Sequence, residues 1–146
     1  MKIKPPTYFL ILLFLSILFH FVFPIKKIIP SPYNHLGWVF IIIGITLNIW
    51  ADNLFKKHKT TVEPGKKSQK LVLEGPFKIS RNPMYLGMVL ILIGTSVILR
   101  SLITFLFPIV FIIIIETIFI PIEEKDMEKV FRKEYQNYKN KIRRWI

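Results

Sequence analysis

Long apolar runs separated by charged segments dominate the pattern of this chain. The runs cover approximately residues 8–23, 36–55, 84–99 and 102–122. A helix needs about 20 apolar residues to cross a bilayer, so each run is close to the length of a transmembrane helix. We therefore predict an all-α integral membrane protein with four transmembrane helices, built as a single domain over residues 1–146. Only Arg100 and Ser101 separate the last two runs, which predicts an antiparallel helical hairpin.

The first run also permits another interpretation, because basic residues before an apolar stretch are typical of a signal peptide. Lys2 and Lys4 precede this run. A Pro-Ile-Lys-Lys sequence beginning at Pro24 follows it, where a cleavage site would need small residues. We therefore interpret the run as a transmembrane helix.

The polarity pattern changes at the end of the fourth run. Residues 123–140 carry apolar side chains at helical spacing, with Lys, Arg and Glu between them. This pattern predicts an amphipathic helix, which we expect to lie on the membrane surface or to fold back over the bundle.

The basic residues predict the orientation of the chain. Two Lys precede the first run, eight Lys and Arg lie within residues 56–82, eight follow Glu124, and three lie on the opposite side. Because cytoplasmic segments carry the excess of Lys and Arg, we expect a cell-membrane protein with both termini and the long loop in the cytoplasm. Nucleic acid is not an expected partner, since the basic residues are not interleaved with exposed aromatic ones.

Cysteine and histidine usage excludes several kinds of site. The chain has no Cys, which excludes disulfides, thiol nucleophiles and zinc–thiolate centres. Its three His, at positions 20, 35 and 58, are too scattered to predict a histidine metal cluster.

Small residues recur at seven-residue spacing in two of the runs. Gly37, Gly44 and Ala51 share one helix face, and Gly87 and Gly94 share another. Small side chains let helix backbones approach closely, so we predict helix packing along both faces. Gly87, near the start of its helix, is also a candidate for leaving room for a ligand.

The segment before the third run is the first with candidate chemistry. It reads Arg-Asn-Pro-Met-Tyr-Leu-Gly from Arg81 to Gly87. Pro83 suits a first helical turn, which places Arg81 and Asn82 at the membrane surface and Tyr85 one turn inside. The N–H groups of such a helix start, together with a guanidinium, can hold an anionic group. An ordinary basic helix cap would explain the same residues.

Acidic residues near the end of the fourth run form the second candidate. Glu123 and Glu124 would either balance nearby Lys or form the negative wall of a site for a cation, closed by Tyr135 and Tyr138. Glu116 lies inside the apolar run, where an ionisable residue is a functional candidate. The alternative for Glu116 is a hydrogen bond to another helix, for example at Asn48 or His20.

Three ordered motifs resemble the family of isoprenylcysteine carboxyl methyltransferases and phospholipid methyltransferases. The segment from Arg81 to Gly87 is similar to the family's Arg-His/Asn-Pro-x-Tyr-x-Gly signature. Residues 60–77 and 123–145 fit the flanking patterns, so the resemblance covers roughly residues 36–146. Two departures are visible: Arg132 stands where the family usually has Gly, and the Gly-x-Gly of phospholipid methyltransferases is absent.

The resemblance implies an integral membrane methyltransferase that uses S-adenosylmethionine. The candidates for binding this cofactor are Asn82, Pro83, Tyr85, Gly87, Glu123, Glu124, Tyr135 and Tyr138. Arg81 and Glu116 are the candidate catalytic residues. Arg81 would orient a carboxylate acceptor, and Glu116 or Glu123 would serve as the base that an amine acceptor needs.

The expected substrate is a lipophilic small molecule that enters from the bilayer lipids. A carboxylate such as a prenyl-cysteine α-carboxyl is the first expectation, and a lipid amine is the alternative. A membrane reductase is a further alternative, because sterol reductases resemble the family in their C-terminal halves. A small four-helix exporter, with Glu116 as its coupling carboxylate, is a third.

Overall fold

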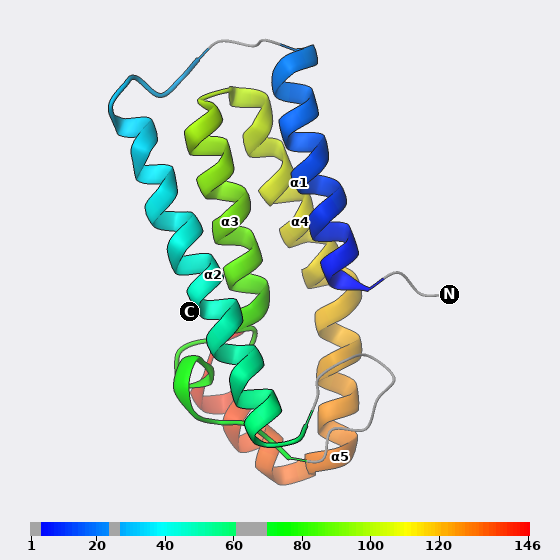
Figure 1. Cartoon of the computed structure of the whole chain (residues 1–146). Coiled ribbons are helices and arrows are strands. Elements are labelled where there is room, and N and C mark those ends of the chain that lie inside the picture. Colours follow the sequence, from blue (N-terminus) through cyan, green and yellow to red (C-terminus); the bar gives the residue numbers. More distant parts are fainter. Residues whose placement is uncertain (1–3, 24–26, 61–69) are drawn as a thin grey trace.

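Four helical columns make up the fold (Figure 1). The computed structural model describes residues 4–23, 27–60 and 70–146. The first three columns are α1 (Pro5–Val22), α2 (Leu36–Lys57) and α3 (Pro83–Leu99). The fourth runs without interruption through η3 (Leu102–Phe105), α4 (Leu106–Ile114), η4 (Ile115–Phe119) and α5 (Ile120–Lys141). The predicted all-α class and the predicted hairpin of the last two apolar helices are confirmed.

Short elements complete the connections between the columns. The 3-10 turns η1 (Tyr33–His35) and η2 (Gly75–Lys78) precede α2 and α3. Two columns, Tyr33–Lys57 and Leu102–Lys141, and also α1, are long and apolar enough to cross a membrane, whereas α3 is apolar but has 17 residues. The α1 helix begins three residues before the predicted start, because Pro5 and Pro6 fit a first helical turn that needs no N–H donors.

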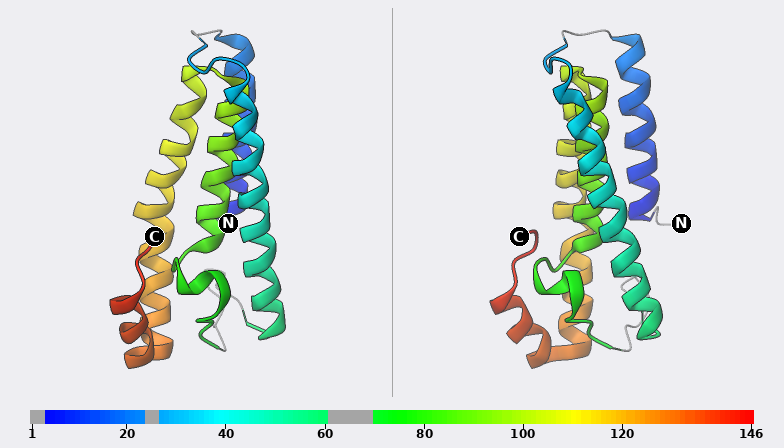
Figure 2. Two further views of the ribbon diagram at one scale, coloured as in Figure 1. Left: turned by 90° about the vertical axis from the view of Figure 1, so that its left-hand side faces the viewer. Right: turned by 60° about the vertical axis from the view of Figure 1, so that its left-hand side comes forward.

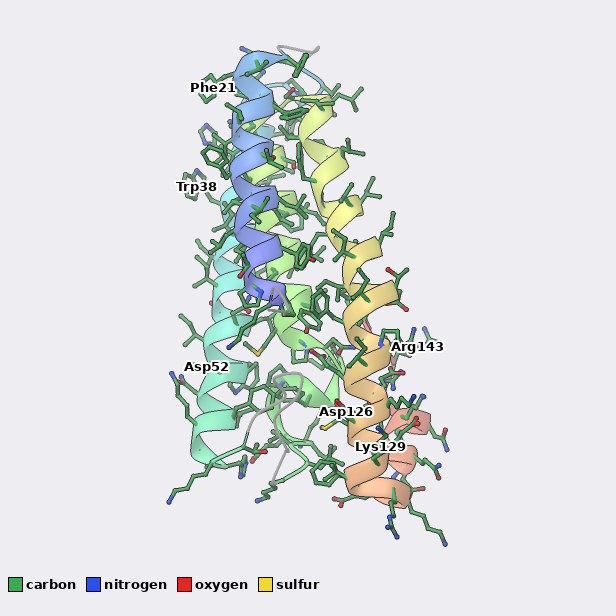
Figure 3. The ribbon with its side chains drawn as sticks, turned by 90° about the vertical axis from the view of Figure 1, so that its right-hand side faces the viewer. Phe21, Trp38, Asp52, Asp126, Lys129 and Arg143 are labelled. Carbon is green, nitrogen blue, oxygen red and sulfur yellow. The ribbon has the colours of Figure 1, made fainter. Side chains whose placement is uncertain are left out.

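The third helix lies at the centre of the fold. One face of α3 packs along α2, and the residues of its other face join α1 and α4 in a shared apolar core (Figure 2). Leu92, Phe111 and Ile115 are completely buried in this core. The outward faces of α1 and α2 carry exposed apolar side chains such as Phe21 and Trp38, as expected for helices that contact lipid (Figure 3).

Glycine pairs form the contact between α2 and α3. A Cβ atom added to Gly87 would lie 2.7 Å from the carbonyl oxygen of Gly44, and one added to Gly94 would lie 2.5 Å from that of Gly37. Only residues without a side chain allow this approach of the two backbones. The packing role predicted from the seven-residue spacing is therefore confirmed.

The amphipathic tail is not a separate helix beginning at residue 123. It continues the fourth column from Ile120 as α5, bends at Arg132, and its last turns fold back toward the bundle (Figures 1 and 2). Nothing in the sequence at residue 123 interrupts the helix. Pro121 does not break it either, because the wider turns of the π-helical segment η4 directly precede it. The fold-back predicted for the tail is therefore present, and its placement on the membrane surface stays a prediction.

The bend at Arg132 provides a test of backbone strain. Arg132 has φ 44° and ψ −116°, a conformation that glycine adopts readily and a residue with a Cβ does not. We expect Arg132→Gly to stabilise the protein by about 1 kcal/mol, measured as a higher thermal midpoint in detergent. Arg132→Ala removes the same side chain but keeps the Cβ, so it should give no such increase. Equal shifts in both variants would contradict the strain.

Candidate active site

A cavity of about 320 Å³ lies at the end of the bundle that carries the long loop. The start of α1, the end of α2, the segment before α3, the start of α3, and α5 surround it. Its volume is at the lower end of the range of small-molecule sites. Eight of the ten candidate site residues line it: Arg81, Asn82, Pro83, Tyr85, Glu123, Glu124, Tyr135 and Tyr138.

Two candidates lie outside this lining. Gly87 faces α2, where an added Cβ would lie 2.2 Å from Asn48 Nδ2, so its lack of a side chain serves helix packing. Glu116 lies in η4, which precedes the cavity-lining part of the fourth column. It accepts hydrogen bonds from Arg144 NH1 at 2.5 Å and from Trp145 Nε1 at 2.9 Å. Asn48, one partner suggested for Glu116, instead donates to the carbonyl of Gly44.

Tyr85 and Glu123 form a polar pair in the cavity wall. Pro83 begins α3, which sets Tyr85 in the first turn of the helix. The Tyr85 hydroxyl donates to Glu123 Oε1 at 2.5 Å, and the tyrosine side chain is buried. A fixed hydroxyl on one carboxylate oxygen orients the group and leaves its other oxygen to accept from a ligand.

Glu124 lies in a different electrostatic environment from its neighbour. Its two oxygens accept from Arg144 Nε and NH2, both at 2.9 Å, and Arg81 NH1 lies 3.0 Å from Oε1. Lys139 Nζ lies 3.4 Å from Oε2. Burial raises the pKa of Glu124, but the hydrogen bond from Arg144 and the charges of Arg81, Arg144 and Lys139 hold it below its ordinary value. Glu124 is therefore a fully paired carboxylate.

Arg81 is a buried cation in the cavity wall. Its side chain is 8% exposed, and Glu124 is its ion-pair partner. Its Nε and NH1 have no hydrogen-bond partner among residues 4–23, 27–60 and 70–146, so the contact of NH1 with Glu124 is an ion pair without hydrogen-bond geometry. A buried guanidinium nitrogen without a partner is unusual, because the loss of solvation is then uncompensated.

The segment after α5 holds the start of α3 in place. The Arg81 N–H donates to the carbonyl of Arg143 at 3.0 Å. The side chains of Ser80 and Asn82 both donate to the carbonyl of Arg144, at 3.0 and 3.1 Å. Backbone and side-chain bonds thus join residues about 62 positions apart in the sequence.

Tyrosines of α5 complete the cavity on the side of the long loop. The Tyr138 hydroxyl donates to the carbonyl of Phe77 at 2.6 Å, and its ring lies 6.1 Å from that of Tyr135. Because the Tyr138 hydroxyl already donates to Phe77, the ring is the part of this lining residue that is left to contact a ligand. Such faces can contact a cation or stack on a planar group.

Several lining residues belong to no motif. Asp52 on α2 and Asp126 on α5 line the cavity, and Figure 3 shows both near the loop-bearing end of the molecule, far from Phe21 and Trp38. A hydrogen bond between the side chains of His58 and Glu74 joins the end of α2 to the segment before η2. Isolated polar residues in a charged loop give no sequence signal for such contacts.

Comparison with known proteins agrees with this architecture. A family model described as phospholipid methyltransferase matches residues 33–134, which include α2, α3, α4 and the first turns of α5. A protein of Haemophilus influenzae described as uncharacterized is 40% identical over 63 residues, which is 43% of this chain and all of that protein. No solved structure matches the chain.

Proposed function

Because the chain belongs to the phospholipid methyltransferase family and is therefore a membrane methyltransferase, we propose that it transfers a methyl group from S-adenosylmethionine to a lipophilic carboxylate. The expected acceptor is an α-carboxyl such as that of a prenyl-cysteine compound. The observation that carries this choice is the buried Arg81 guanidinium in the cavity wall, with its unpartnered Nε. Guanidinium is the side-chain group best matched to a carboxylate, which it can bind through two N–H donors.

The cavity residues fit the proposed cofactor in charge and chemistry. S-adenosylmethionine combines a sulfonium and an ammonium with a carboxylate and a planar base. Asp126 provides negative charge, and the rings of Tyr135 and Tyr138 provide π faces. Burial raises the pKa of Glu123 to about 7, and a cation bound beside this carboxyl would favour its ionised form. The proposed site thus uses Glu123 as its principal carboxylate for a cation, since Glu124 is already paired with Arg81 and Arg144.

The chain's residues would act mainly by positioning. When bound, the cofactor supplies an electrophilic methyl group on a positively charged sulfur. Arg81 would orient the acceptor carboxylate. The Tyr85 hydroxyl would hold the Glu123 carboxyl toward the positively charged groups of the cofactor. A carboxylate is already ionised at neutral pH, so this reaction needs no general base. Catalysis of this kind follows from holding the acceptor carboxylate in line with the methyl group of the cofactor and from excluding water from both.

Apolar side chains of the lining support a lipophilic acceptor. Those contributed by α1, α3 and α5 include Pro5, Pro6, Met84, Met88, Met127 and Val130. Unbranched methionine side chains adapt to irregular apolar groups such as a lipid chain. We propose that the acceptor reaches this wall from the surrounding bilayer lipids.

A lipid amine is the second candidate acceptor, favoured by the description of the matching family. An amine must lose a proton before or during transfer, which requires a base in the cavity. Glu123 lines the cavity, whereas Glu116 is paired with Arg144 and lies outside its lining. In this alternative Glu123 is therefore the better candidate base. The pairing of Glu116 also disfavours its role as the coupling carboxylate of an exporter.

Methyl transfer to the two acceptor classes tests the proposal. The purified protein in vesicles would receive S-adenosylmethionine labelled in its methyl group, with either a prenyl-cysteine or phosphatidylethanolamine. We expect label in the prenyl-cysteine, released as methanol by mild base because the product is an ester. Base-stable label in phosphatidylethanolamine, with none in the prenyl-cysteine, would overturn the carboxylate assignment.

The sidedness of the membrane is a separate expected outcome. The distribution of Lys and Arg predicts that reporter tags at residues 1 and 146 both face the cytoplasm. Protease added outside intact cells should cleave neither tag, and permeabilised cells should lose both. Cleavage of either tag in intact cells would contradict the orientation.

A further inference from the structure

Arg144 bonds to two carboxylates that lie on different parts of the fourth column. Its Nε and NH2 donate to the two oxygens of Glu124, and its NH1 donates to Glu116. Glu124 lines the cavity, whereas neither Arg144 nor Glu116 does. Arg144 therefore does not line the cavity itself, but it bonds to Glu124, which does.

The bidentate bond fixes the plane of the Glu124 carboxylate. Two parallel N–H···O bonds specify the orientation of both partners, which a single-point contact such as lysine does not. The same Oε1 that accepts from Arg144 Nε lies 3.0 Å from Arg81 NH1. The orientation that Arg144 imposes on Glu124 thus reaches the guanidinium in the cavity.

Glu116 binds Arg144 from the apolar part of the fourth column that precedes Glu124 in the sequence. It lies in the π-helical segment η4 and accepts from both Arg144 and Trp145. Three carboxylates, Glu116, Glu124 and Glu128, then balance three cations in a contiguous chain of pairs; the cations are Arg81, Lys139 and Arg144. Such a balanced set can keep charges at the edge of a bilayer that would be unfavourable singly.

We propose that Arg144 is a positioning residue that aligns Arg81 through Glu124, and that Glu116 holds Arg144 in the required orientation. The inference rests on the proposed function, because it concerns how Arg81 meets an acceptor carboxylate. It assigns Glu116 to the support of the site and not to proton transfer. The bonds of the Arg143 and Arg144 carbonyls to residues 80–82 fix the backbone from which Arg144 extends.

Kinetics of Arg144→Lys test the proposal. This variant keeps the charge but loses the two-point bond, so the acceptor should bind in a less favourable orientation. We expect the KM for a prenyl-cysteine acceptor to rise roughly 10-fold or more, with the dissociation constant of S-adenosylmethionine changed less than about twofold. Arg143→Lys is the matched control, because the Arg143 side chain is exposed and its carbonyl bond is kept. It should leave both constants unchanged.

Glu116→Gln provides the second variant, in case Arg144→Lys does not fold. It should raise the same KM without shifting the pH profile of kcat, since no proton is taken by Glu116. The double variant Glu116→Gln with Arg144→Lys should be little worse than Arg144→Lys alone, because the two residues act in one series.

The outcomes separate this inference from the proposed function. Unchanged acceptor KM in a folded Arg144→Lys variant, or a shifted pH profile in Glu116→Gln, would overturn the positioning roles. A multiplicative loss in the double variant would do the same. A wild-type protein that methylates only the amine would refute the proposed function itself.

Discussion

Arg81→Lys should lower kcat/KM for a carboxylate acceptor by roughly 10- to 150-fold, while the affinity for S-adenosylmethionine stays nearly constant. Lysine keeps the positive charge beside Glu124, so the buried carboxylate is not left without a partner. What it loses is the planar pair of donors proposed to hold the acceptor carboxylate, and hydrogen bonds to charged groups are worth about 1.5–3 kcal/mol. Initial rates at saturating cofactor measure the effect.

Arg132→Lys is the matched control for this substitution. Arg132 is exposed at the bend of α5 and does not line the cavity, so the same chemical change there should leave the rate unaltered. A fully active Arg81→Lys variant would refute the acceptor-binding role of Arg81. If the acceptor is an amine instead, Glu123→Gln should be the more damaging change and should move the pH optimum.

Glu123→Gln should weaken the binding of S-adenosylmethionine by roughly 10- to 150-fold. The glutamine keeps the shape of the side chain but cannot ionise, so it would lose the charged contact proposed with the cationic end of the cofactor. Tyr85→Phe removes only the hydroxyl that orients Glu123, so its effect should have the same direction and be smaller. Equilibrium dialysis with labelled cofactor measures both variants.

Glu134→Gln is the control for the loss of a carboxylate. Glu134 lies on the exposed part of α5 and outside the cavity lining, so this variant should bind the cofactor like the unaltered protein. Unchanged affinity in both Glu123→Gln and Tyr85→Phe would show that this wall of the cavity does not contact the cofactor.

The architecture could be predicted because it depends on local patterns. The length of each apolar run follows from the thickness of a bilayer, and the hairpin follows from the two-residue link at Arg100. The seven-residue spacing of glycines directly encodes the contact between α2 and α3. The family signature from Arg81 to Tyr85 led to residues that line one cavity.

The partners of the charged residues could not be predicted in the same way. Glu116 pairs with Arg144 and Trp145, which follow it by 28 and 29 positions, because α5 bends and the chain returns. The direction of that return depends on the backbone at Arg132, which is unfavourable for arginine and leaves no periodic signal. Long-range ion pairs of this kind are a product of the tertiary fold.

The glycine contacts between α2 and α3 also determine which parts of the protein can move. Gly37 meets Gly94 and Gly44 meets Gly87, so sliding either helix would bring bulky side chains against the opposing backbone. The helices α2 and α3 therefore behave as one rigid unit. The long loop leaves this unit at the end of α2 and returns to it at the start of α3. A motion that widens the cavity would therefore involve α1, α5 or the segment before α3, which line it together with the two helices.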